Sequence, residues 1–165
     1  MTKRVFRSIF LASLAVLLAT LALILGALYT YFSDVQAEQL RLQTALVAHA
    51  LETEGVSYFD GLDTSDRRVT WIAADGTVLY DSRSDSGVME NHLEREEVKA
   101  ALATGSGTSF RYSDTLMERY IYTAQRLSDG TVLRLSAAQN TVPHLVLGVV
   151  KPIILVIGIA VALSA

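Results

Sequence analysis

Cysteine is absent from the 165 residues of this sequence, and proline occurs only twice. Without cysteine the chain can form no disulfide bond, no thiolate metal site and no cysteine nucleophile. Exported bacterial domains often lack cysteine too, so its absence does not identify the cellular compartment. The compartment has to be argued from the distribution of charged residues instead.

Charged residues are also missing from one long stretch, between Arg7 and Asp34. Its 26 residues, 8–33, would form roughly 39 Å of helix at about 1.5 Å per residue, more than the ~30 Å hydrocarbon core of a bilayer. A cleaved signal peptide is the alternative, but its apolar region should span only about 7–15 residues. The stretch therefore predicts an uncleaved transmembrane helix over 8–33.

The residues at the two ends of this stretch predict its orientation. Three basic residues precede it, namely Lys3, Arg4 and Arg7. Three aromatic residues gather at its far end, where an aromatic belt is expected, namely Tyr29, Tyr31 and Phe32. By the positive-inside rule, residues 1–7 form a cytoplasmic N-terminus and the chain leaves the membrane on its outer side.

A second apolar stretch ends the sequence, with Lys151 as the only charged residue after Arg134. We expect residues 144–165 to begin a second, truncated transmembrane helix, with Lys151 reaching back to the outer interface. The uninterrupted part, Ile153–Ala165, has 13 residues, whereas a span needs about 20. Because no basic flank follows, we expect the sequence to be an N-terminal fragment of a longer protein.

The segment between these stretches, residues 34–143, is acidic. It contains all 17 acidic residues and ten of the 14 basic ones, which gives a net charge of −7. A nucleic-acid partner is therefore not expected, because binding phosphates requires clustered lysine and arginine. The charge suits a domain that faces the medium outside the membrane.

Two Asp-Gly pairs, Asp75-Gly76 and Asp129-Gly130, each lie between two β-prone runs. A two-residue type I′ hairpin turn needs positive φ at both central residues. Asp tolerates positive φ and Gly adopts it freely, so Asp-Gly favours this turn. Five strands are predicted over about 68–73, 77–81, 108–113, 119–127 and 131–137, with a helix over 93–103 ended by Gly105. The fold class is therefore α+β, with an antiparallel sheet behind a long N-terminal helix.

That N-terminal helix is a predicted stalk over 34–56, which has no proline and no glycine before Gly55. Its apolar residues fall on two stripes. One stripe holds Val35, Leu42, Leu46 and His49/Ala50, and the other holds Leu40, Val47 and Leu51. We expect one stripe to pack on the sheet and the other to meet a second copy in a parallel homodimer. Alternatively, both stripes form one wide face within the chain.

Several stretches together resemble the extracytoplasmic PAS-like (Cache-type) sensor region of bacterial two-component histidine kinases, especially the phosphate-regulon-sensor-like group. They are residues 68–82 (Arg-Val-Thr-Trp-Ile-Ala-Ala-Asp-Gly-Thr-Val-Leu-Tyr-Asp-Ser), 89–98 (Met-Glu-Asn-His-Leu-Glu-Arg-Glu-Glu-Val), 111–115 (Arg-Tyr-Ser-Asp-Thr) and 129–134 (Asp-Gly-Thr-Val-Leu-Arg). The resemblance covers most of residues 5–165. One departure is Glu96, where such sequences commonly have proline.

The resemblance implies a PAS-like five-stranded antiparallel sheet, with residues 34–143 as the sensor domain between two transmembrane helices. It also implies a cytoplasmic kinase that phosphorylates a response regulator. Its ATP-binding domain and phospho-accepting histidine are not part of this sequence, so no catalytic residue and no cofactor are expected here. The same sensor could instead serve a chemoreceptor or a diguanylate cyclase, or the chain could be a membrane-tethered binding protein without signalling output.

A small-molecule pocket between sheet and helix also follows from the resemblance. Candidate lining residues are Tyr80, Arg83, His92, Arg95, Arg111, Tyr112 and Tyr120. Arginines beside aromatic rings suit a small anionic ligand with a carboxylate or phosphate group. Alternatively, the tyrosines belong to the core and the arginines pair with Asp81, Asp85 or Asp114. His92 with Asp81, Asp85 and Glu90 could form a divalent-cation site or a pH-sensing cluster, but EF-hand spacing is absent and solvated acidic loops are common, so no metal site is expected.

Overall fold

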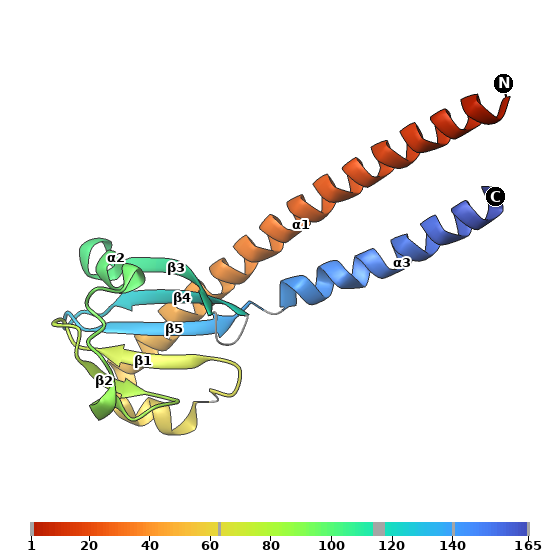
Figure 1. Ribbon diagram of the computed structural model, residues 1–165. Helices are drawn as coiled ribbons and strands as arrows, with labels where there is room; N and C mark the ends of the chain where they lie inside the picture. Colours follow the sequence, from red (N-terminus) through yellow and green to blue (C-terminus); the bar gives the residue numbers. More distant parts are fainter. Residues whose placement is uncertain (1, 63, 114–117, 140, 165) are drawn as a thin grey trace. The chain divides into compact units, whose positions relative to one another are not determined.

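The structure is a computed structural model that describes residues 2–62, 64–113, 118–139 and 141–164. It divides into two compact units. One unit holds residues Met1–Asp34 and Thr141–Ala165, and the other holds Val35–Asn140. Helix α1 (Thr2–Glu54) contributes residues to both units, and α3 (Thr141–Ser164) belongs to the first (Figure 1).

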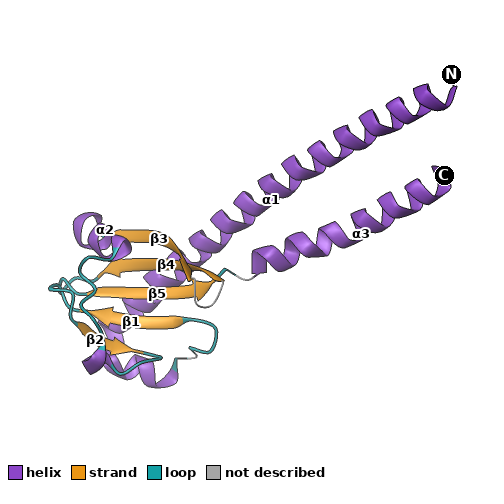
Figure 2. Cartoon of the chain, in the orientation of Figure 1, coloured by secondary structure: helices purple, strands orange, loops and turns teal. Residues whose placement is uncertain are grey.

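The unit Val35–Asn140 is built on one five-stranded sheet. Its strands are β1 (Arg68–Ile72), β2 (Val78–Asp81), β3 (Ser106–Ser113), β4 (Glu118–Arg126) and β5 (Val132–Ala138). Their order is β2-β1-β5-β4-β3, and every neighbouring pair is antiparallel (Figure 2). The predicted α+β class with a long N-terminal helix and a five-stranded antiparallel sheet is confirmed.

One face of the sheet packs against the second half of α1. Leu40, Ala48 and Leu51 of α1 are buried in one cluster with side chains of β1, β4 and β5. The short 3₁₀ helix η1 (Gly55–Gly61) adds Phe59 to the same cluster. Strand side chains alternate between the faces, so Val69 and Leu135 point to this side. The core on this face is apolar, and its burial stabilises the stalk half of α1 on the sheet.

The opposite face of the sheet packs against α2 (Glu96–Thr104). Val98 and Ala101 of α2 are fully buried in a second cluster, together with Ile72 of β1. Gly107 of β3 permits the close approach, because a Cβ there would lie 2.2 Å from the carbonyl oxygen of Glu97. The glycine thereby sets how near α2 lies to β3.

Both Asp-Gly hairpins form, but their turns differ from the predicted two-residue type I′ form. The Gly76 N–H donates to the Ala73 carbonyl, and the Ala73 N–H donates to the Thr77 carbonyl, so three residues make the loop. Gly76 alone needs the left-handed region, with φ +88°, and Asp75 accepts from the Thr77 N–H. The second hairpin repeats this arrangement around Gly130. Asp-Gly thus serves a three-residue loop with a left-handed glycine at its end.

The helix predicted over 93–103 begins later, at Glu96, and ends as predicted at the left-handed Gly105. The reason is tertiary. Asn91 donates to the carbonyl of Asp75 and accepts from the Leu93 N–H, and the His92 N–H donates to the Gly76 carbonyl. These bonds hold residues 91–93 against the first hairpin turn.

In the first unit, one described helix is long and apolar enough to cross a membrane, and it is α1. The predicted second transmembrane helix over 144–165 is not confirmed. Residues Thr141–Ser164 are helical, but the described apolar stretch of α3, Leu147–Ile159, is shorter than a span requires.

Candidate functional site

The candidate site lies on the sheet face that α2 covers, and the strand register assembles it. Thr70 of β1 pairs with Asp81 of β2 on one side and with Arg134 of β5 on the other. Ser136 of β5 pairs with Tyr122 of β4. Because cross-strand partners share a face, polar side chains from all of these strands converge there.

Glu97 of α2 is the centre of the first polar cluster. Its side chain is fully buried and accepts a hydrogen bond from Ser109 Oγ at 2.6 Å. Arg111 donates to the same carboxylate through Nη2, and Arg134 approaches it through Nη1 at 3.4 Å. Burial raises the pKa of Glu97, but the Ser109 hydrogen bond and the two positive charges outweigh it, so the pKa lies below its usual value.

A second carboxylate, Asp81 of β2, continues this cluster across the sheet. Arg134 Nη2 donates to Thr70 Oγ1 at 3.1 Å, and Thr70 Oγ1 donates to Asp81 Oδ2 at 2.8 Å. Arg68 then donates through Nε to Asp81 at 2.9 Å. Burial raises the pKa of Asp81. Hydrogen bonds from the Arg68 side chain, the Arg83 backbone N–H and the Thr70 hydroxyl lower it by more, so the pKa lies below its usual value.

Arginine and tyrosine side chains stack within the same face. The Arg111 guanidinium lies 3.9 Å from the centroid of the Tyr122 ring, and that of Arg134 lies 5.5 Å from it. Arg134 is 4% exposed, and burial lowers its pKa to about 10. Even so, Arg134 stays protonated at neutral pH, so the cluster keeps its positive charges.

His92 is buried and sits in a positive environment. Burial lowers the pKa of His92, and the charges of Arg134, Arg95 and Arg68 lower it further against the opposing effect of the Glu90 carbonyl. That carbonyl lies 2.7 Å from Nδ1. Because a carbonyl can only accept, Nδ1 carries the proton of the neutral ring.

A polar cavity of about 260 Å³ opens beside this network. Arg68 and Tyr122 belong to both the network and the cavity wall. The remaining lining residues are Asp66, Arg83, Tyr120, Ser136, Ala137 and Ala138. The cavity therefore combines guanidinium groups, phenol and serine hydroxyls and one carboxylate, which is a set suited to binding a small charged molecule.

Two of the seven predicted ligand residues line this cavity, Arg83 and Tyr120. Arg111 lies next to it, stacked on Tyr122 and bound to Glu97. His92 is buried near Arg134, away from the cavity lining. The predicted set is therefore only partly brought together.

The other three predicted residues lie elsewhere. Tyr80 is placed on the α1 face, stacked on Phe59 with ring centroids 4.3 Å apart. Its register partner Trp71 packs against the same cluster, so Tyr80 does not line the polar cavity. Tyr112 is 57% exposed on β3. Arg95 is the N-cap residue of α2 and makes no side-chain cap hydrogen bond.

The alternative pairing of the candidate arginines with Asp81, Asp85 or Asp114 is not seen among the described residues, where Arg111 pairs with Glu97 instead. Asp81 pairs with Arg68 rather than with the guanidinium of Arg83, which donates to the carbonyl of Ser65 at 3.2 Å. Asp114 lies outside the described residues. Among the residues that are described, no group of three or more histidine, aspartate or glutamate side chains is arranged to hold a metal ion.

Sequence analysis missed Arg68, Arg134, Tyr122 and Glu97 as members of the site. One signal was available for Arg134, which interrupts the most apolar strand, between Leu133 and Leu135. A charge in the middle of such a strand needs a buried partner. Glu97 gave no comparable signal, because two adjacent glutamates at a helix start usually face solvent.

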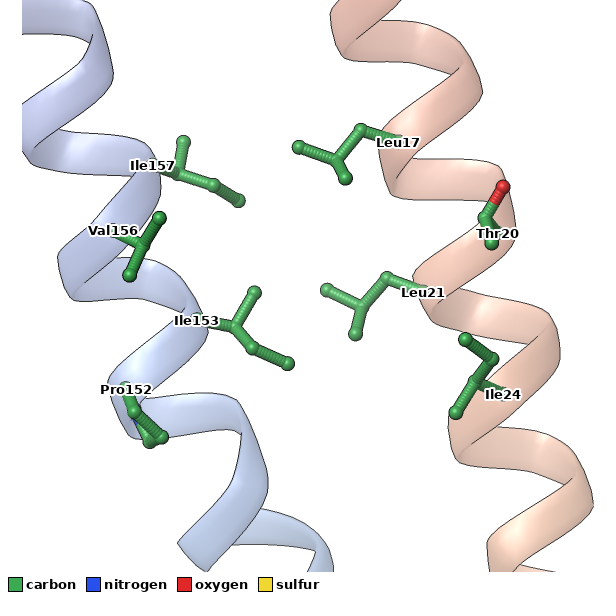
Figure 3. Close-up of a pocket in the computed structure, with 8 residues that line it drawn as sticks. All are labelled: Leu17, Thr20, Leu21, Ile24, Pro152, Ile153, Val156 and Ile157. Carbon is green, nitrogen blue, oxygen red and sulfur yellow. The ribbon is translucent and has the colours of Figure 1, made fainter.

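A second cavity, of about 390 Å³, lies between α1 and α3 in the first unit (Figure 3). Leucine and isoleucine side chains of the two helices point toward each other across it, including Leu21 and Ile153. The one polar lining side chain is Thr20, whose hydroxyl donates to the Val16 carbonyl of its own helix at 2.9 Å. This cavity offers no charged group and is typical of packing between apolar helices.

No family model matches the sequence, and no curated protein matches it significantly. Among solved structures, the chain is similar to the "Crystal Structure of the extracellular domain of the putative histidine kinase rpHK1S-Z16". The identity is 13% and the TM-score is 0.40. The match covers 52% of this chain and 36% of that one, so it spans about a third of that structure's length.

Proposed function

We propose that this chain is the membrane-anchored, extracytoplasmic signal-sensing module of a bacterial two-component histidine kinase. In this proposal, residues 8–33 span the plasma membrane, residues 34–143 form a PAS-like sensor domain outside, and residues 144–165 begin a second span. An external cue changes the geometry of the two membrane helices in a homodimer. A cytoplasmic kinase then passes the signal to its response regulator.

The observation that carries this proposal is the division of the two stripes on the stalk half of α1. Leu40, Ala48 and Leu51 are buried against the sheet. By contrast, Leu42 is 52% exposed and Leu46 is 69% exposed on the same helix. A helix that follows an apolar stretch and whose leucines are exposed among the described residues is suited to pair with a second copy.

The spacing of the uncovered stripe supports a parallel pair. Val35 and Leu42 are seven residues apart, and Leu46 follows Leu42 by four, which is the alternation of a two-stranded coiled coil. In a parallel dimer, each of these residues would meet its own copy. Such a pair would join the two sensor domains to the helices that enter the membrane.

Cysteine crosslinking tests the dimer directly, because the chain has no cysteine of its own. Single substitutions Leu42→Cys and Leu46→Cys are expected to form disulfide-linked dimers in membranes under mild oxidation. Arg41→Cys and Ala45→Cys, exposed on other faces of the helix, are the matched controls and should crosslink far less. Equal crosslinking at all four positions, or at none, would show that the stripe is not a dimer contact.

The same lack of cysteine allows the topology to be tested. Ser57→Cys is expected to react with a membrane-impermeant maleimide in intact cells, whereas Arg4→Cys should react only after the cells are opened. Both residues are exposed in their own units. The reverse pattern would place the sheet domain in the cytoplasm and remove the sensor proposal.

Two other outputs remain as alternatives, a chemoreceptor or a diguanylate cyclase, together with a tethered binding protein without signalling output. The coding sequence that follows Ala165 discriminates among them. A helical linker and a histidine-containing dimerisation helix support the kinase. A coiled-coil signalling hairpin or a cyclase domain keeps the sensor and changes the output, and a stop codon favours the tethered binding protein.

A further inference from the structure

We propose that the polar cavity lined by Arg68, Arg83, Tyr120 and Ser136 binds a compact anion that carries a carboxylate or phosphate group. The inference rests on the proposed sensor function and names the chemistry of its ligand. The arginine donors, the charge balance around the cavity and the cavity's size support it.

Two arginines on the cavity wall, Arg83 and Arg68, have N–H groups that pair with no described residue and can bind a ligand. Arg83 donates through one nitrogen, Nη2, to the carbonyl of Ser65, and no described carboxylate lies within ion-pair distance of its guanidinium. Arg68 uses Nε on Asp81 and Nη2 on Ser84, which leaves Nη1 without a partner among the described residues. Two arginines on one cavity wall with unused N–H groups can hold an oxyanion by charge-assisted hydrogen bonds.

The charge balance around the cavity points the same way. Four arginines line it or stack on its wall, namely Arg68, Arg83, Arg111 and Arg134. Three carboxylates oppose them, namely Asp66, Asp81 and Glu97. Among the described side chains one positive charge is therefore in excess, in a segment whose net charge is −7.

Size and composition narrow the ligand class. A volume of about 260 Å³ is below the roughly 300–1,000 Å³ of pockets for drug-sized ligands, so a molecule of few heavy atoms fits. Asp66 on the wall disfavours ligands with three or more negative charges, because like charges repel at close range. Inorganic phosphate and short carboxylates meet both conditions.

The cavity is also connected to α2. Arg68 binds Asp81, and hydrogen bonds continue from Asp81 through Thr70 to Arg134, which lies against Glu97. An anion that draws Arg68 toward the cavity would weaken its bond to Asp81. Ligand binding would then change the hydrogen bonds of the buried Glu97 carboxylate, which holds α2 on the sheet.

The test uses the full 165-residue chain in detergent, titrated separately with inorganic phosphate, acetate and succinate against chloride at equal ionic strength. Thermal unfolding followed by the fluorescence of Trp71 is the measurement, and binding to the native state raises the melting temperature. At least one of the three anions is expected to give a saturable rise. A rise with phosphate alone identifies a phosphate ligand, and a rise with the carboxylates alone identifies a carboxylate ligand.

Three variants make the test specific. Arg83→Gln is expected to weaken binding about tenfold or more, because it removes a charged donor from an exposed side chain. Asp66→Asn is expected to strengthen binding, because it removes the repelling carboxylate. Arg67→Gln is the matched control, since Arg67 is an exposed neighbour that does not line the cavity, and it should bind like the unchanged chain.

Two results would overturn the proposal. One is no rise with any of the three anions beyond the effect of chloride, and the other is the same affinity in the Arg83→Gln and Arg67→Gln chains. Either result leaves the sensor proposal standing if Leu42→Cys and Leu46→Cys crosslink selectively. If an anion binds but the cysteine variants do not crosslink selectively, the anion-site proposal stands and the dimeric sensor proposal fails.

Discussion

Glu97 and Arg134 form an ion pair in which both side chains are buried, with 0% and 4% of their surfaces exposed. A pair of this kind contributes little net stability when intact, because burying two charges costs nearly as much as their attraction returns. Breaking it is different, since one charge is then left buried without compensation. The pair therefore makes the contact between α2 and the sheet sensitive to any change of charge.

We expect Glu97→Gln to lower the free energy of unfolding by about 3 kcal/mol, because Arg111 and Arg134 would lose their shared counter-charge. Urea unfolding followed by Trp71 fluorescence measures the change. Glu94→Gln is the matched control, because Glu94 is exposed and pairs with the exposed Lys99. Its effect should stay below about 1 kcal/mol. If both variants lower the free energy of unfolding equally, the buried pair contributes no more to stability than the exposed one.

Acid should destabilise the sheet domain through Glu97 and Asp81. Both have a lowered pKa in the folded state, so the unfolded chain binds protons first as the pH falls. Their contribution is complete above the ordinary values of about 4.3 and 3.9 and is lost as the pH falls through the lower folded values. Unfolding free energies measured from pH 6 to pH 3 should fall less steeply in Glu97→Gln. If the unfolding free energies of the unchanged chain and of Glu97→Gln fall with pH at the same slope, the lowered pKa of Glu97 is contradicted.

His92 should titrate below its ordinary pKa of about 6.5, since burial and nearby arginines disfavour its charged form. A lowered histidine pKa means that the unfolded state binds the proton more readily, so stability falls as the pH drops below about 6.5. Imidazole ¹H–¹⁵N NMR spectra should show the proton on Nδ1 and a midpoint below that of the urea-unfolded chain. Coinciding midpoints would place His92 in a solvent-like environment.

Gly107→Ala should loosen the contact between α2 and β3. The added Cβ would lie 2.2 Å from the Glu97 carbonyl oxygen and 2.8 Å from the Ala100 Cβ, so the helix must move. Overpacking of this kind costs about 1–3 kcal/mol of unfolding free energy. Gly61→Ala is the control, because its Cβ would meet nothing within 4 Å, and it should change stability by no more than about 0.5 kcal/mol. If Gly107→Ala leaves the free energy of unfolding unchanged, α2 can move away from β3 without a cost in stability.

Local signals in the sequence predicted most of the sheet. The two Asp-Gly pairs marked both hairpins, and Gly105 marked the end of α2, because left-handed backbone favours glycine whatever surrounds it. The type of hairpin turn was wrong, since Asp-Gly is compatible with both two-residue and three-residue loops and only the closing hydrogen bonds distinguish them. The start of α2 was also displaced, because Asn91 and His92 bind a turn that is distant in sequence.

The sequence by itself determined the α+β class, the five strands and the apolar stretch at the start of α1, since each depends on periodicity or composition along the chain. It also determined that the stalk has two apolar stripes. Only the tertiary structure decided which stripe is buried, that Tyr80 faces away from Arg83, and that Glu97 meets Arg111 and Arg134. These contacts depend on strand order and register, which bring together residues up to dozens of positions apart through burial and charge pairing that no local pattern encodes.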